Sequence, residues 1–141
     1  MNSSSDYPSS ATKVALVTDA ASTLGRFISR ALAGQGWDLA LQYQPDDNAA
    51  ATLALVKECE AMGRRAFVFS ANLDDEIAVK QLVPSIISAL GSLSCILNNA
   101  SIAAHDRATD FSVVQLERHM RRNLSAPLLL SQALHTATPE G

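Results

Sequence analysis

Apolar runs rich in β-branched residues alternate with helical patterns along most of the chain, and this alternation limits the fold more than any other feature. The runs predict four strands, at residues 13–18, 38–44, 66–70 and 95–97. The connections between them are far too long for hairpins, so the strands are expected to lie parallel, with helices as crossovers. Right-handed crossovers favour an α/β, doubly wound, Rossmann-like sheet of four strands in the order 3-2-1-4, with helices on both faces.

Between and after these strands, apolar residues recur at helical spacing and predict four helices. The apolar positions that define them are Leu24, Phe27, Ile28, Ala31 and Leu32; Leu53, Val56 and Cys59; Val79, Leu82, Val83, Ile86 and Leu90; and Leu116, Met120, Leu124, Leu128 and Leu134. We therefore expect a partial Rossmann-type domain over residues 13–141. The Ser-rich residues 1–12 are expected to form a disordered tail.

Residues that favour helix ends mark where these helices begin and stop. Asn48 is placed to cap the second helix, and Ser112 and Gln115 have capping-box spacing at the fourth. The acidic residues 74–76 suit the N-terminus of the third helix. Pro84 lies inside that helix and predicts a kink or an early end. The glycines expected to end the first three helices are Gly36, Gly63 and Gly91.

The composition excludes several functional classes. Of 141 residues, 48% are hydrophobic and 18% are charged, which is typical of a globular domain, and no apolar run approaches the ~18 residues of a membrane span. The net charge of −3 gives no reason to expect nucleic acid or an anionic membrane as partner. Cys59 and Cys95 form no disulfide framework and predict buried, inert thiols in a cytoplasmic protein. His105, His119 and His135 lack metal-ligand spacing to them, so no metal site is predicted.

A turn of small residues joins the first strand to the first helix. It reads Thr18-Asp19-Ala20-Ala21-Ser22-Thr23-Leu24-Gly25-Arg26. In a doubly wound sheet this turn is the natural phosphate site, because free N–H groups and the helix dipole face an anion there. The segment resembles the Thr-Gly-x-x-x-Gly-x-Gly turn of the short-chain dehydrogenase/reductase family. The alternative is a turn that only packs the helix against the strand.

The match to that turn is incomplete, which predicts weakened dinucleotide binding. Thr18 and Gly25 match, but Asp19 and Thr23 stand where the family has glycines. The Asp19 carboxylate would repel a diphosphate, and Thr23 adds a side chain where the backbone should approach the ligand. The hydroxyls of Ser22 and Thr23 could donate to phosphate and offset part of this loss. The resemblance implies cofactor contacts from Thr18, Asp19, Ser22, Thr23, Leu24 and Gly25.

Two segments after later strands extend the resemblance. Asn72-Leu73 follows the third strand, where the family commonly carries Asp-Leu or Asp-Val near the adenine. Asn98-Asn99-Ala100-Ser101 resembles the family's Asn-Asn-Ala-Gly segment beside the cofactor ribose. The resemblance therefore adds Asn72, Leu73, Asn99, Ala100 and Ser101 to the cofactor-binding residues. An ordinary Asn-rich turn after the fourth strand remains the alternative.

The end of the second strand bears on the choice between NAD(H) and NADP(H). An acidic residue there binds the ribose 2′-hydroxyl, whereas Arg accommodates a 2′-phosphate. This chain has Tyr43-Gln44 at that point, with neither. The missing acid favours NADP(H), but Asp46 and Asp47 just beyond would oppose a phosphate, so the preference is slight.

Asn123 lies where the family has a helix Asn whose backbone carbonyl holds a water linked to the catalytic Lys. Pro127 supplies a physical reason, because proline has no N–H to bond that carbonyl, and the helix should bend there. A surface helix with an incidental kink is the alternative. Ser101 and the Arg-Asn-Leu-x-Ala-Pro run resemble the pteridine-reductase-like branch. The pair Arg121-Arg122 on this helix is expected to be solvated.

The family's catalytic Tyr-x-x-x-Lys pair is absent. The only tyrosines are Tyr7 and Tyr43, and the residues four positions later are Ala11 and Asp47. No fifth strand follows to carry the catalytic Ser. The resemblance thus implies the N-terminal, cofactor-binding part of an NAD(P)(H)-dependent oxidoreductase acting on a small carbonyl, imine or pterin-like substrate, truncated before the fifth strand and inactive alone.

A second hypothesis is a non-catalytic nucleotide-binding or oligomerisation module. The fourth strand would form an open sheet edge and the last helix would expose apolar surface, which predicts self-association or pairing with a second chain.

Overall fold

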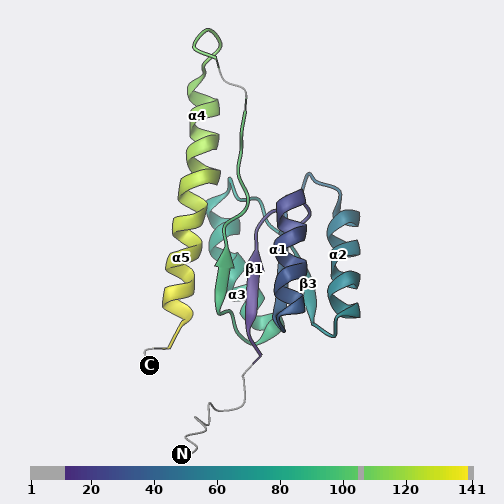
Figure 1. Ribbon diagram of the computed structural model, residues 1–141. Coiled ribbons are helices and arrows are strands. Elements are labelled where there is room, and N and C mark those ends of the chain that lie inside the picture. Colours follow the sequence, from purple (N-terminus) through teal and green to yellow (C-terminus); the bar gives the residue numbers. More distant parts are fainter. Residues whose placement is uncertain (1–11, 105–106, 140–141) are drawn as a thin grey trace, which may run out of the picture.

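A computed structural model, which describes residues 12–104 and 107–139, contains one parallel sheet with the strand order β3-β2-β1-β4 (Figure 1). The strands are β1 (Val14–Val17), β2 (Asp38–Tyr43), β3 (Ala66–Ser70) and β4 (Cys95–Leu97). The predicted fold class and strand order are therefore confirmed. Residues 1–11 of the predicted tail, and His105, lie outside the described residues.

The helices begin and end close to the predicted positions. They are α1 (Thr23–Gly34), α2 (Ala49–Ala61), α3 (Glu76–Leu90), α4 (Val113–Met120), the π-helical turn η1 (Arg121–Ser125) and α5 (Ala126–Ala137). Asn48 and Ser112 cap α2 and α4 as predicted: the Asn48 side chain accepts from the N–H of Ala50, and Ser112 accepts from that of Gln115. In the described part of the chain, no helix combines the length and apolarity that a membrane crossing requires.

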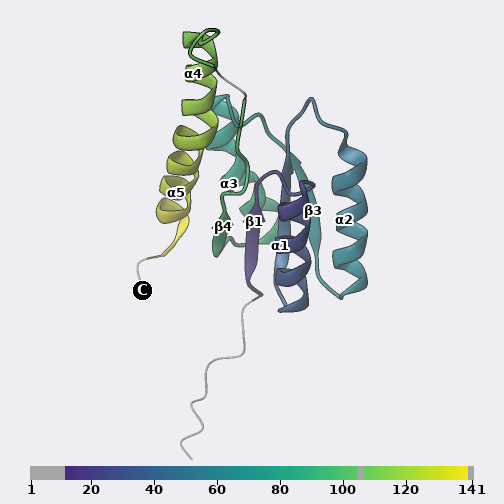
Figure 2. The ribbon, with the colours of Figure 1, turned by 45° about the horizontal axis from the view of Figure 1, so that its top comes forward.

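Helices cover both faces of the sheet, as Figures 1 and 2 show. The side chains of Val14 and Leu16 on β1 join a cluster with α3 and α5, whereas Ala15 and Val17 join a cluster with α1 and α2. All four are fully buried, which explains why β1 reads as a continuous apolar run. The carboxyl ends of the strands therefore meet at one edge, between the two helical layers.

The apolar stripe predicted for α1 is correct only in part: Ile28 and Leu32 pack against the buried cluster, but the fully buried residues of the helix are small. They are Gly25, Ser29 and Ala33. Small residues allow the helix axis to approach the sheet closely. Leu24 is 59% exposed and Phe27 is 71% exposed. The predicted apolar positions of α1 and α2 that are exposed are Leu24, Phe27, Ala31 and Leu53.

The last predicted helix is divided into α4, η1 and α5. At Asn123, where a bend is predicted, the chain forms the π turn, in which the N–H of Ala126 donates to the carbonyl of Arg121. Pro127 follows directly, and it has no N–H that could donate to the carbonyl four residues earlier, as a regular α-helix requires. The face predicted to pack is correct only at Leu134, which packs against the core; the fully buried residues of α5 are Ala126 and Leu130. The exposed apolar residues along these three segments include Leu116, Met120, Leu124 and Leu128.

Pro84 does not end α3 early. The helix continues through it to Leu90, and Gly91 caps it in the left-handed conformation with φ of +90°. Pro84 lies on the exposed side of the helix, where the carbonyl that loses its partner can be hydrated. The early end predicted from this residue is therefore wrong.

Candidate functional site

Thr18 joins the end of β1 to the segment after β4. Its hydroxyl accepts from the N–H groups of Asn99 and Ala100, at 3.0 and 2.9 Å. The same hydroxyl donates to the carbonyl of Leu97 at 3.3 Å. Since Thr18 is only 1% exposed, it positions the neighbouring loops and does not itself reach a ligand.

The side chain of Asn99 supports the β1–α1 turn through hydrogen bonds. Its Nδ2 lies 3.0 Å from the carbonyl of Thr18, 3.1 Å from that of Asp19 and 3.0 Å from Ser22 Oγ. The Asn-Asn-Ala segment is thus more than a surface turn, because one amide organises the backbone of the predicted phosphate loop. Asn99 supports that loop through its side chain and fixes the neighbouring Ala100 through its backbone.

Ser22 is the N-cap of α1. Its Oγ accepts from the N–H of Gly25 at 3.1 Å and donates to the carbonyl of Asp19 at 2.9 Å. The phosphate contact predicted for this hydroxyl would require it to turn away from Asp19. Thr23 is the first residue of α1 and is exposed, as is Leu24, so both stand at the helix end that faces an anion.

Gly25 is required for packing inside the turn. A Cβ atom there would lie 2.4 Å from the carbonyl oxygen of Asp19 and 2.9 Å from that of Ala20. Asp19 itself has a φ of +48°, the only positive value at a non-glycine in the described residues. It therefore takes up the left-handed conformation that glycine adopts most readily.

Gln42 is a functional residue that the sequence analysis missed. It is fully buried in β2, where its Oε1 accepts from the N–H of Asp19 at 2.8 Å. Its Nε2 donates to the carbonyl of Ala71, just after β3, at 2.7 Å. One side chain therefore connects three strand ends. The available signal was a Gln inside an otherwise apolar strand.

A cavity of about 260 Å³ opens at the carboxyl ends of the strands. Its lining includes five of the predicted cofactor residues: Asp19, Gln44, Asn72, Ala100 and Ser101. The other lining residues are Asp46, Asp47, Asp74, Arg118 and Arg122, of which the last three were not predicted. The structure therefore brings together loops from all four strands with the helix that follows β4.

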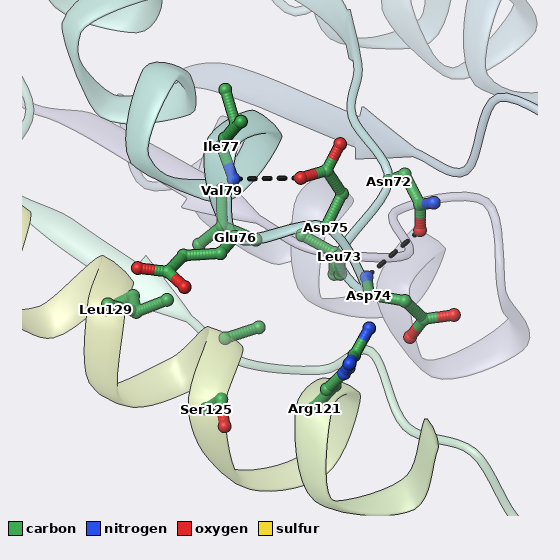
Figure 3. A pocket seen from close by; sticks show the side chains of 11 residues that line it. Asn72, Leu73, Asp74, Asp75, Glu76, Ile77, Val79, Arg121, Ser125 and Leu129 are labelled. Carbon is green, nitrogen blue, oxygen red and sulfur yellow. Dashed lines mark hydrogen bonds between the residues drawn. The ribbon is translucent and has the colours of Figure 1, made fainter. Parts of the chain in front are cut away.

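Two further predicted residues, Tyr43 and Leu73, do not line this cavity. Tyr43 ends β2 and is half-buried, and Gln44 accepts from the N–H of Leu73 at 3.4 Å. Leu73 is buried and lines a second, larger cavity of about 650 Å³. That cavity lies between the start of α3 and the helical residues 121–129 (Figure 3).

Arg122 was predicted to be solvated, but the structure places its side chain in a mostly buried ion pair, so this prediction is wrong. Its Nε and Nη2 donate to the two carboxylate oxygens of Asp74, at 2.9 and 2.6 Å. Both side chains are only 17% exposed. Arg118, one turn earlier, lies 3.8 Å from the same carboxylate. The charged pair fastens the helical segment to the loop after β3.

Asn123 is also fastened to a loop. Its side chain accepts from the N–H of Ile102 at 2.8 Å and donates to the carbonyl of Ile102 at 3.0 Å. This pairing fixes the segment that follows Ser101. The role predicted for the backbone carbonyl of Asn123 in holding water stays a prediction.

Four carboxyl groups line part of the cavity: those of Asp19, Asp46, Asp47 and Asp74. Burial raises the pKa of Asp19, the nearby Asp47 raises it further, and Arg122 lowers it. A diphosphate at the turn would meet this carboxylate, so the predicted weakening has a structural basis. No cluster of His, Cys, Asp and Glu that could hold a metal ion occurs among residues 12–104 and 107–139. Cys59 is buried, as predicted, and burial raises the pKa of its thiol to about 11, whereas Cys95 is half-buried.

Comparison with known proteins agrees with the family resemblance of the motif segments. A family model described as short chain dehydrogenase matches residues 13–140. The chain is 38% identical over 91 residues to the 3-oxoacyl-[acyl-carrier-protein] reductase FabG of Staphylococcus aureus, covering 64% of this chain and 36% of that protein.

Solved structures resemble the fold closely. A blue fluorescent protein from a metagenomic library, in complex with NADPH, has a TM-score of 0.85 and 35% identity, covering 90% of this chain and 51% of that one. FolM alternative dihydrofolate reductase 1 from Brucella suis, in complex with NADP, has a TM-score of 0.82 and 26% identity, covering 90% of this chain and 52% of that one. The chain therefore spans between a third and about half of the length of the proteins it matches.

Proposed function

Because this chain belongs to the short-chain dehydrogenase/reductase family, we propose that it binds a nicotinamide dinucleotide for hydride transfer to a small carbonyl, imine or pterin-like substrate. The observation that carries the proposal is the cavity at the carboxyl ends of the strands, where five predicted cofactor residues meet. Ligands of open α/β sheets bind at such a position. A cofactor bound there would supply or accept the hydride.

The residues of the site fit the adenosine of the cofactor better than its diphosphate. The 260 Å³ cavity suits the adenosine, since a whole drug-sized ligand usually needs roughly 300 to 1,000 Å³. The diphosphate would lie at the start of α1, where the N–H groups of Thr23 and Leu24 have no acceptor within the helix. Asp19 opposes it there. We propose NADP(H) over NAD(H), supported by the missing acid at Tyr43-Gln44 and by NADP complexes among the similar structures.

Asn123 would take part through its backbone carbonyl. The π turn and Pro127 interrupt the regular helical hydrogen bonds at this point, which supports a carbonyl that can bind water. We propose that this water belongs to the proton relay. The 141 residues contain no Tyr-x-x-x-Lys pair, so we expect no turnover from them alone.

We further propose a pterin-like substrate and a cytoplasmic location. The resemblance of residues 121–127 to the pteridine-reductase-like branch supports the substrate class, as does the likeness to a dihydrofolate reductase at 26% identity. Ser101 lines the cavity and is exposed, so its hydroxyl could contact a substrate.

Titration with NADPH and NADH, followed by thermal unfolding, tests the proposal. A Kd of about 10 μM and 1 mM ligand would add ~2.7 kcal/mol to the free energy of unfolding. The double variant Asp19→Gly, Thr23→Gly should bind more tightly, because it removes a repelling charge and a side chain from the turn. A matched control is Thr109→Gly, Asp110→Gly, which removes the same residue types from an exposed loop outside the cavity. No stabilisation of the native chain by either cofactor would refute dinucleotide binding.

The second candidate function is a self-associating, non-catalytic module. The observation that favours it is the exposed apolar row on α4, η1 and α5, formed by Leu116, Met120, Leu124 and Leu128. These side chains are between 45% and 61% exposed, and their spacing of four residues places them along one side of the helical segment.

Sedimentation at tens of micromolar tests this candidate. The native chain should self-associate, and Leu124→Gln, Leu128→Gln should shift it toward the monomer. Phe27→Gln on α1 is the control, because it removes an exposed apolar side chain from the opposite helical layer. A stable monomer of the native chain at this concentration would refute the module.

A further inference from the structure

The ion pair between Arg122 and Asp74 has a fixed orientation, which an ordinary surface ion pair lacks. Two bonds, Nε to Oδ1 at 2.9 Å and Nη2 to Oδ2 at 2.6 Å, run between the same two groups. Such bidentate pairing fixes the plane of the guanidinium as well as its position. With each side chain 17% exposed, solvent competes little for these bonds.

This pair stands at the wall of the adenosine-sized cavity. Arg122 lines the smaller cavity, and Asp74 lines both the smaller and the larger one. The preceding residue, Arg121, lines the larger cavity and points toward the loop of Asp74 (Figure 3). Arg122 also lowers the pKa of Asp19, so the guanidinium and the turn act on each other across the smaller cavity.

The position of the phosphate turn determines what would lie beside Arg122. If the diphosphate is at the start of α1 and the ribose is at the end of β2, the base must extend away from Asp19 and past Gln44. On that side the neighbour of β2 is β3, and the loop after β3 contributes Asn72 and Asp74 to the lining, with Arg122 bonded to Asp74. Asp74 pairs with Arg122 through two hydrogen bonds, and the more exposed Arg118 lies 3.8 Å from the same carboxylate.

We propose that Arg122 is a specificity-determining residue of the cofactor site, which presents its guanidinium plane to the purine ring while Asp74 holds it in place. This role rests on the proposed dinucleotide binding. Arginine stacks on aromatic rings through its flat, delocalised group, and lysine has no such plane. The acidic groups Asp19, Asp46 and Asp47 on the facing loops add to the preference for an uncharged ring over an anion.

Calorimetric titration of the native chain and three variants tests this role. The probes are NADPH, NADH and ADP-ribose, which contain the purine, and reduced nicotinamide mononucleotide, which does not. Arg122→Leu should weaken binding of the three purine ligands by about tenfold, within the range for loss of a base-stacking side chain. Arg122→Lys should weaken it several-fold. Arg121→Leu is the matched control, because it removes the same charge one residue away and from the other cavity, and it should change binding less than twofold.

The outcomes separate the two proposals. If the native chain binds none of the purine ligands at 1 mM, the proposed function fails and this role fails with it. If the native chain binds them and Arg122→Leu binds equally well, only the role of Arg122 is refuted. An equal loss for the mononucleotide would show that Arg122 merely shapes the site, which also refutes purine contact. Should Arg122→Leu not fold, Arg122→Lys, which keeps the charge beside Asp74, decides by the same criterion.

Discussion

The β1–α1 turn and the helical segment of residues 113–137 both depart from regular structure, but they are held in opposite ways. The turn is supported from inside: the side chains of Gln42 and Asn99 bond its backbone, and the Thr18 hydroxyl connects it to the segment after β4. The helical segment is attached from outside, by Arg122 to Asp74 and by Asn123 to Ile102. In the turn, Thr18 and Gln42 are fully buried, whereas no residue of 113–125 is fully buried.

This difference indicates which region tolerates change. In the turn, Gln42 is fully buried and Thr18 is 1% exposed, so removing either polar side chain leaves buried partners unsatisfied. In the helical segment, the bonds between Asn123 and Ile102 are exposed, so the Ile102 groups can be hydrated when that side chain is lost. We therefore expect substitutions in the turn to lower the free energy of unfolding much more than equivalent ones in the helix.

Gly25→Ala should have the largest effect. The added Cβ would lie 2.4 Å from the backbone oxygen of Asp19, which cannot move without disrupting the bonds from Ser22 and Asn99. We expect a loss of about 3 kcal/mol in the free energy of unfolding, measured by urea denaturation.

Gly34→Ala is the matched control for this substitution. Gly34 is the last residue of the same helix, and a Cβ there meets nothing within 4 Å. The change should stabilise the chain by roughly 0.5 to 1 kcal/mol, because alanine favours the helix. Equal effects of the two substitutions would show that the turn is not tightly packed.

A pair of asparagines compares the two regions directly. Asn99→Ala removes a donor shared by three acceptors in the turn and should cost about 2 kcal/mol. Asn123→Ala removes two bonds to Ile102 at an exposed position and should cost about 0.5 kcal/mol. Urea denaturation of both variants measures the difference. A larger loss for Asn123→Ala would overturn the distinction between internal and external support.

The fold could be predicted from the sequence because its signals are local. Alternating apolar runs and helical patterns, with caps at Asn48 and Ser112, determine elements and their order without reference to distant contacts. The buried face of a helix could not be predicted where small residues face the sheet. Leu24 and Phe27 looked like the apolar side of α1, yet Gly25, Ser29 and Ala33 are what allow close packing.

The same reasoning applies to the site. Residues in the motif segments, such as Asn99 and Asp19, could be found because each follows a strand. Gln42 and Arg122 could not, because each acts through a partner 23 or 48 residues away in the chain. Only the parallel arrangement of the strands brings those partners together. Polar residues in apolar elements are therefore worth testing as site residues even without a motif.

The smallest expected effect is a pH dependence of cofactor affinity caused by Asp19, the charged residue that stands where the family has a glycine. Burial and Asp47 raise the pKa of Asp19 above its ordinary value of 3.8, so ionising this carboxyl opposes folding. The stability that it contributes is complete at pH below 3.8 and is lost as the pH rises through the raised pKa. The same ionisation repels a diphosphate, so affinity for NAD+ should fall several-fold as the pH rises through that range. NAD+ is the suitable probe, because the 2′-phosphate of NADP+ would titrate near pH 6. Asp19→Asn should bind more tightly at neutral pH and lose most of this pH dependence, whereas Asp110→Asn, outside the cavity, should keep it. An unchanged pH dependence in Asp19→Asn would mean that another group, and not the residue in the glycine position, limits cofactor binding.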